Sequence, residues 1–115
     1  MNPNTYPPEY LDFIRLFNQE KFFEAHEVLE LCWRRQEGRE RAYYHGLIQI
    51  AAALVHLQKG TPEGGKRLLK TASKYLETFR PSFMELDLEK LLAETKEACL
   101  LKEKISFPKV ACQTR

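Results

Sequence analysis

The feature that most constrains the fold is a stretch at residues 40–59 whose apolar side chains point in nearly every direction around a helix. Successive residues of an α-helix are rotated by about 100°, and a helix that is apolar almost all round is a buried one. We therefore expect this segment to form the central helix of the molecule. Its apolar residues are Tyr43, Tyr44, Leu47, Ile48, Ile50, Leu54 and Val55.

One stripe of this segment is small and polar instead, and it consists of Ala42, His45, Gly46, Gln49, Ala53, His56 and Gly60. Small side chains let a neighbouring helix approach closely, and polar ones then need hydrogen-bond partners from that neighbour. We expect the helix at about residues 22–36 to supply those partners through His26 and Glu30. The sequence thus predicts a two-helix polar seam of His26, Glu30, Gln49 and His56.

Amphipathic spacing predicts four further helices, at about residues 9–18, 22–36, 62–80 and 87–104. No stretch alternates with period two over the length of a strand, so we expect no sheet. The predicted fold class is all-α, a compact single-domain bundle of about five helices with the third one central. We expect residues 1–8 to be an extended lead-in, residues 9–104 the helical domain and residues 105–115 an irregular tail.

Glycine, proline and capping residues mark the predicted helix boundaries. Gly38 is expected to provide a left-handed C-cap after the second helix, and Gly60 to end the third. Thr61 then caps the fourth helix, with Pro62 at its first position, and Asp87 caps the fifth.

The composition is that of a soluble globular domain, with 43% apolar and 30% charged residues in a chain of 115. No apolar run reaches the length of a membrane span, and the first residues do not resemble a secretion signal, so we expect a cytoplasmic protein without membrane contact. A net charge of +2 gives no indication of nucleic-acid binding. Three widely spaced cysteines, Cys32, Cys99 and Cys112, are expected to be reduced structural thiols.

The helix at residues 22–36 carries ionisable groups on its aromatic side. With His26 as the origin, Glu30 falls at about +40° and Trp33 at about −20°, while Phe22 and Phe23 lie to either side. We therefore expect a histidine and a carboxylate to point into a buried stripe, where they must be paired, neutralised or used. Glu27 projects on the opposite arc.

Two interpretations of His26 and Glu30 remain open. Their i, i+4 spacing suits two ligands of a divalent metal or a small-molecule site, including a hydrolytic one with Glu27 as a candidate general base. The second histidine of a zincin helix is missing, however. The same residues equally suit a hydrogen-bonded structural network completed by Gln49 and a histidine. The structural network, with no cofactor and no catalytic activity, is the favoured expectation.

The segments Phe22-Phe23-Glu24-Ala25-His26-Glu27-x-x-Glu30-x-x-Trp33 and Gly46-Leu47-Ile48-Gln49 together resemble the motif pair of domain-of-unknown-function family 309, a family of small prokaryotic proteins. The likeness continues through His56 and departs at Gly60-Thr61 and Gly64-Gly65, where the family tends to have Gly-Asn and Gly-Ala. The resemblance implies a compact helical fold, and it places His26, Glu27, Glu30, Trp33, Gly46 and Gln49 in the family's motif. It implies no activity.

The sequence therefore favours an interaction module, in which the polar seam is structural and the outer faces bind a protein partner or a second copy of the chain. A metal-dependent or small-molecule site on His26 and Glu30 is the alternative. The sequence does not identify a substrate.

Overall fold

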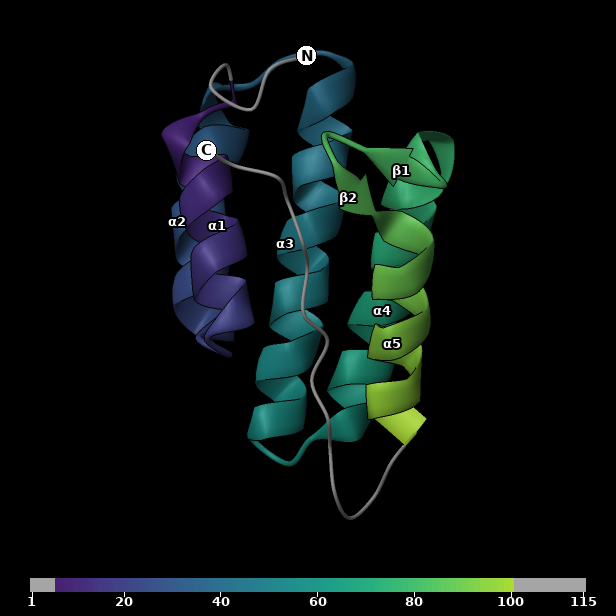
Figure 1. Ribbon diagram of the computed structural model, residues 1–115. Helices are drawn as coiled ribbons and strands as arrows, with labels where there is room; N and C mark the ends of the chain where they lie inside the picture. The colour runs from purple at the N-terminus through teal and green to yellow at the C-terminus, as the bar shows by residue number, and fades with distance from the viewer. Residues whose placement is uncertain (1–5, 101–115) are drawn as a thin grey trace.

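The computed structural model describes residues 6–100, and five α-helices make up most of that range (Figure 1). They are α1 (Pro8–Asn18), α2 (Phe22–Arg35), α3 (Arg39–Gln58), α4 (Pro62–Leu76) and α5 (Leu88–Leu100). A 3-10 turn, η2 (Glu77–Phe79), follows α4, and two short strands, β1 (Ser82–Phe83) and β2 (Leu86–Asp87), precede α5. The predicted tail at 105–115, the end of the predicted fifth helix and the first five residues of the lead-in lie outside the described residues.

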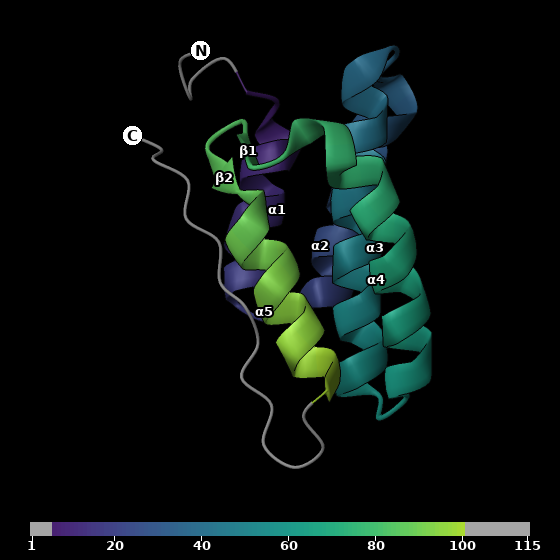
Figure 2. The same cartoon turned by 90° about the vertical axis from the view of Figure 1, so that its right-hand side faces the viewer.

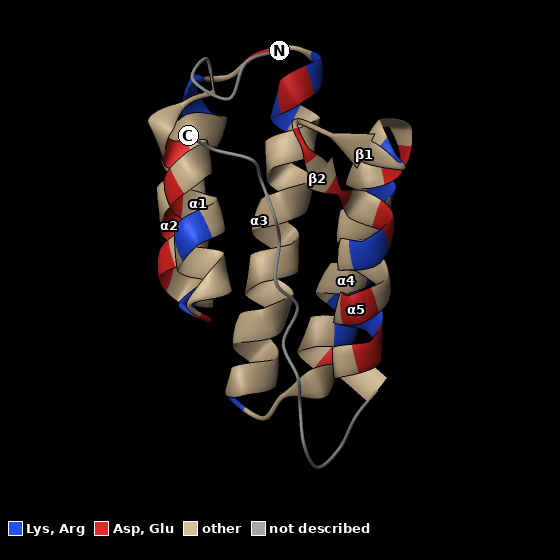
Figure 3. Ribbon diagram, viewed as in Figure 1, with Lys and Arg blue, Asp and Glu red and all other residues tan. Residues whose placement is uncertain are grey.

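Helix α3 is central, as its all-round apolar pattern predicts. It stands between the α1–α2 pair on one side and the α4–α5 pair on the other (Figures 1 and 2), and it packs against both α2 and α4. Charged residues lie on the surrounding helices and at the first turn of α3, whereas the rest of α3 carries none (Figure 3). The all-α, single-domain prediction is confirmed. None of the described helices has the length and apolar character that crossing a membrane requires.

The core is rich in aromatic rings. Five aromatic side chains are fully buried: those of the tyrosine and phenylalanines of α1, the first residue of α2 and Tyr43 of α3. Neighbouring rings meet edge-on or tilted at centroid distances near 5–6 Å, which is a favourable geometry for aromatic pairs. The α1 and α2 residues concerned are Tyr10, Phe13, Phe17 and Phe22. These contacts fix α1 and α2 against α3.

The boundary between α3 and α4 follows the predicted glycine and proline positions but not the predicted cap. Gly60 has φ +79°, which ends α3, and Pro62 begins α4. The Thr61 hydroxyl makes no cap for α4. It turns back to α3 instead, where Oγ1 lies 3.0 Å from the carbonyl oxygen of His56 and 2.9 Å from its Nδ1. Thr61 thus stands at the predicted N-cap position of α4, but its side chain does not cap the helix.

Gly38 also has a role different from the predicted one. Helix α2 ends at Arg35, and Gln36 is extended, so Gly38 is not the residue that terminates this helix. It has φ +73° and stands directly before α3. A positive φ favours glycine, so Gly38 suits this position in the link between α2 and α3.

A small hairpin between η2 and α5 was not expected from the sequence. Strands β1 and β2 are antiparallel, with Phe83 opposite Leu86, and the turn residues Met84 and Glu85 have φ +46° and +64°. The hydroxyl of Tyr10 donates to the Met84 carbonyl at 2.9 Å, and that of Tyr43 donates to the Phe83 carbonyl at 3.1 Å. These tyrosines of α1 and α3 hold a turn that local sequence does not specify.

Helix α5 then begins at Leu88. The side chain of Asp87 accepts a hydrogen bond from the backbone N–H of Lys90 at 3.0 Å, so the predicted Asp87 cap is confirmed.

The small residues of the stripe on α3 face α4, whereas α2 was the predicted neighbour. A Cβ placed on Gly46 would lie 2.6 Å from Leu76 of α4, and one on Gly65 of α4 would lie 3.0 Å from the backbone oxygen of Ala53. The first distance is shorter than real Cβ contacts and the second is tighter than most of them, so the helices come together because these positions lack a side chain. Close approach was predicted correctly, but the partner helix was not.

Candidate functional site

Helix α2 is rotated relative to the orientation that its aromatic residues suggest. Its buried residues are Phe22, Ala25, Leu29 and Cys32, whose directions centre about 80° away from His26. His26 and Glu30 consequently lie at the edge of the buried face, with side chains 25% and 33% exposed. The expectation that both point into a buried stripe is wrong, because Ala25 and Cys32 complete the core face that Phe23 was expected to share.

His26 and Glu30 form one local group along α2. The Nε2 of His26 lies 3.7 Å from one carboxylate oxygen of Glu30, and the other oxygen lies 3.9 Å from the Arg34 guanidinium one turn further on. The ring of Phe23 lies beside that of His26, at a centroid distance of 5.9 Å. Within residues 6–100, the Nδ1 of His26 is buried without a hydrogen-bond partner. This group offers one imidazole and one carboxylate.

A second group surrounds His45 of α3. Its ring stacks on Tyr75 of α4 at 4.3 Å and meets Trp33 of α2 at 5.2 Å, and the Arg41 guanidinium lies 4.3 Å above the Trp33 ring. Burial, and then the positive charge of Arg41, lower the pKa of His45 below its ordinary value. His45 is therefore a neutral ring at physiological pH and acts as a spacer between three helices.

Gln49 belongs to this second group. Its Nε2 lies 3.1 Å from the Nε2 of His45, one turn earlier on the same helix. The amide nitrogen is the donor in this pair, so His45 accepts with an unprotonated nitrogen, in agreement with its lowered pKa. The Oε1 of Gln49 is buried and has no hydrogen-bond partner in the part of the chain that the structure describes.

The predicted seam residues are thus divided among three places. His26 and Glu30 lie together on α2, and Gln49 lies with His45 and Trp33. His56 is at the far end of α3, where it bonds to Thr61. A Cβ on Gly64 would lie 2.5 Å from the His56 ring, so Gly64 makes room for it. Gly46 serves the contact between α3 and α4. The prediction that His26, Glu30, Gln49 and His56 form one seam between α2 and α3 is therefore wrong.

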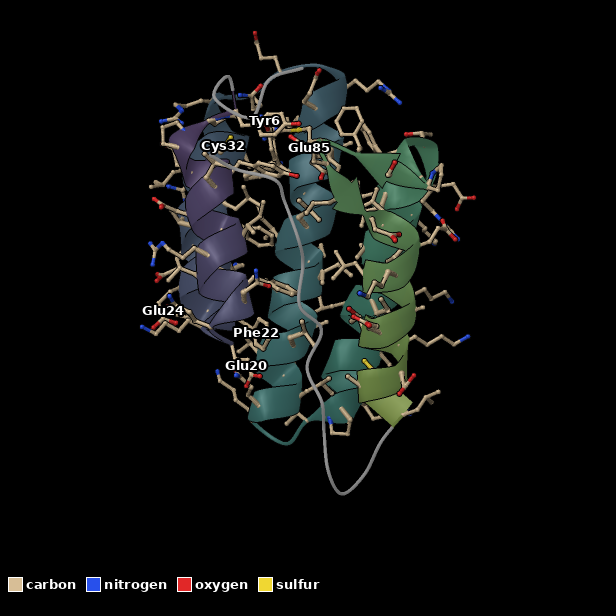
Figure 4. The ribbon with its side chains drawn as sticks, viewed as in Figure 1. Tyr6, Glu20, Phe22, Glu24, Cys32 and Glu85 are labelled. Carbon is tan, nitrogen blue, oxygen red and sulfur yellow. The ribbon has the colours of Figure 1, made fainter. Side chains whose placement is uncertain are left out.

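The outer face of α2 carries features that the sequence analysis assigned otherwise. Phe23, expected in the buried stripe, is 53% exposed, and Leu31 is 50% exposed. An open depression of about 490 Å³ on the same helix is lined by Glu24, Glu27, Val28, Glu30, Leu31 and Arg34. Glu24 projects outward from this face (Figure 4). Including Ala25 and Cys32 in the helical projection would have revealed this face from sequence.

The described residues contain no group of three or more histidine, cysteine, aspartate or glutamate side chains placed to hold a metal ion. Cys32 and Cys99 are buried free thiols, as expected of structural cysteines, and burial raises the pKa of each. A thiol that resists ionisation is a poor nucleophile. Cys112 lies outside the described residues.

Together, these contacts define a small all-α domain whose polar motif residues His26, Glu30 and Gln49 are partly buried on α2 and α3. Residues 10–68 match the family described as "Domain of unknown function (DUF309)". The chain belongs to this family, as its motif pair indicated.

Three similar proteins place the chain among relatives. It is 34% identical to a conserved hypothetical protein from Thermus thermophilus, whose crystal structure superposes with a TM-score of 0.71 over 82% of this chain and 98% of that one. It is 33% identical over 86 residues to the uncharacterized protein YpuF of Bacillus subtilis (strain 168), covering 73% of this chain and 49% of YpuF. An uncharacterized protein of Aquifex aeolicus (strain VF5) is 31% identical over 88 residues, 76% of this chain and 26% of that protein.

Proposed function

We propose that this domain is a protein-interaction module that docks a partner on the outer face of α2. The observation that carries the proposal is the exposure of Phe23 and Leu31, two large apolar side chains on one side of a single helix. Among residues 6–100 only four large apolar side chains are exposed, and two of them are this pair. Large exposed apolar side chains beside charged residues are typical of a binding surface.

The shape of the surface supports docking over catalysis. The depression on α2 is open and lined by a single helix, whereas substrate sites are usually concave and enclose most of a small ligand. The relatives also suit a module, because the chain spans about half of YpuF and about a quarter of the Aquifex protein.

Site-specific photo-cross-linking tests the proposal. A photoreactive amino acid replaces Leu31 in the producing cell, and the same residue replaces exposed Lys90 of α5 as a matched control. We expect a discrete cross-linked protein at Leu31 and none at Lys90. Once that protein is identified and purified, titrating it with the purified domain should reproduce the binding. Equal cross-linking at both positions, or none at Leu31, would refute docking on α2.

A divalent-metal site is the second candidate, and one observation favours it. The His26 Nε2 and a Glu30 oxygen are 3.7 Å apart, close enough for both to reach one ion from adjacent turns. A complete site would need further ligands from water, a substrate or a partner. Elemental analysis after addition of zinc, manganese, iron or nickel, with His26→Ala as control, tests it: stoichiometric metal lost in the variant supports the site, and no metal in the wild-type protein refutes it.

A further inference from the structure

We infer that the partner of the α2 face is a basic amphipathic helix of another protein and not a second copy of this chain. The inference rests on the proposed function, and it adds the chemistry of the occupant. It follows from the charges around the depression. Three carboxylates, those of Glu24, Glu27 and Glu30, line the depression against one guanidinium, that of Arg34.

Most of this negative charge is not neutralised within the domain. Arg34 is already shared with Glu30 at 3.9 Å, and in residues 6–100 neither Glu24 nor Glu27 forms an ion pair. The neighbouring Arg35 is engaged with Glu9 of α1 at 2.7 Å. Lysine or arginine side chains of a partner would find two carboxylates available on the rim of an apolar contact.

Pairing of two α2 faces is disfavoured by the same charges. Two copies related by a twofold axis present the same patch to each other, so six carboxylates would share the interface with two Arg34 side chains. Like charges brought together across an interface oppose association. The surface is therefore complementary to a positively charged partner, and not to itself.

The spacing of the apolar side chains indicates a helical partner. Phe23 and Leu31 are eight residues apart, about 12 Å along the helix axis, with Glu27 between them at one turn from each. A partner helix with apolar residues at i, i+4 and i+7 presents them over about 10.5 Å, close to this length. Lysine or arginine on its flanks would then face Glu24 and Glu27.

Two synthetic peptides of 18 residues test the inference, both with leucine at i, i+4 and i+7 and with either lysine or glutamate at the flanking positions. Binding to the purified chain is measured by fluorescence anisotropy at several salt concentrations, and the contact is mapped by backbone amide shifts. We expect the lysine peptide to shift α2 resonances and to bind at least tenfold more tightly than the glutamate peptide. Higher salt concentrations should weaken binding of the lysine peptide.

Variants with the same change of net charge distinguish attraction of the peptide to the α2 face from its attraction to the overall charge of the domain. Glu24→Lys with Glu27→Lys should weaken the lysine peptide at least tenfold, whereas Glu77→Lys with Glu97→Lys, the same change of charge on exposed residues elsewhere, should change its affinity less than threefold. Equal effects of both pairs would overturn the inference, as would failure of the lysine peptide to bind.

The remaining outcomes distinguish the inference from the proposed function. If sedimentation equilibrium shows a dimer that Phe23→Ser with Leu31→Ser dissociates, or if the glutamate peptide binds to α2 as tightly as the lysine peptide, the assigned chemistry is wrong and the docking face stands. If no peptide or second copy binds to α2, and Leu31 also gives no cross-link, both proposals fail together.

Discussion

Replacing Gly46 with alanine probes the contact between α3 and α4, on which the orientation of the motif residues depends. The added methyl group would lie 2.6 Å from Cγ and Cδ2 of Leu76 and 3.3 Å from Cβ of Tyr75. Carbon atoms in favourable contact are about 3.5–4.0 Å apart, so the overlap is about 1 Å. Leu76 is fully buried and cannot turn into solvent to relieve it.

The net effect is the balance of two opposing contributions. Overpacking of this kind costs about 1–3 kcal/mol, and an overlap of about 1 Å belongs at the upper end of that range. Alanine gains about 1 kcal/mol over glycine within a helix. We therefore expect Gly46→Ala to lower the free energy of unfolding by about 2 kcal/mol, which corresponds to a fall in Tm of about 8 °C in a domain of this size.

Urea and thermal unfolding followed by circular dichroism measure this change, and two comparisons identify its cause. Gly64→Ala meets the half-exposed His56 ring, which can rotate away, so its net effect should be within about 1 kcal/mol of zero. In a Leu76→Ala background the methyl group at Gly46 fills space, so its cost should disappear. A stabilised Gly46→Ala protein, or an undiminished cost beside Leu76→Ala, would refute the packing described here.

Three further predictions concern other contacts. Tyr43→Phe removes the hydroxyl that donates to the hairpin at 3.1 Å, and should cost about 1–2 kcal/mol in chemical unfolding, whereas an unchanged stability would mean that the turn holds itself. Burial keeps the pKa of His45 lower in the folded protein than in the unfolded chain, so the unfolded chain binds more protons at low pH. The free energy of unfolding should therefore be at its full value above about pH 6.5 and fall below that pH. His45→Gln should remove this fall, and a fall that persists in the variant would contradict its attribution to His45. In a Cys112→Ser variant, Cys32 and Cys99 should react with a thiol reagent only on unfolding, and rapid labelling of the native protein would show that they are not buried.

The sequence predicted those parts of the fold that local chemistry determines. The apolar circumference of α3 requires burial wherever its neighbours lie. Gly60 and Pro62 end one helix and begin the next regardless of tertiary contacts. The hairpin could not be predicted in this way, since each strand has two residues and no period is measurable. Its turn depends on hydroxyl groups from α1 and α3, which are distant in sequence.

The candidate site was harder to predict because small residues determine which face of a helix is buried. Phe23 has the larger side chain, yet Ala25 is fully buried and Phe23 is half exposed. Giving most weight to the large side chains therefore predicted the wrong buried face of α2, and it placed His26 and Glu30 on that face. The small stripe of α3 indicated close approach but not which helix approaches, because Gly46 fits either neighbour equally well.

The most direct test of the central proposal is the free energy of unfolding of the double variant Phe23→Ser with Leu31→Ser. If both side chains serve a partner and not the fold, the variant should unfold within about 0.5 kcal/mol of the wild-type protein, as surface substitutions do. Phe22→Ser, at the fully buried neighbour, should cost at least about 3 kcal/mol. A loss of more than about 2 kcal/mol in the double variant, comparable with that of a core substitution, would show that α2 is covered within the domain and would contradict a docking face.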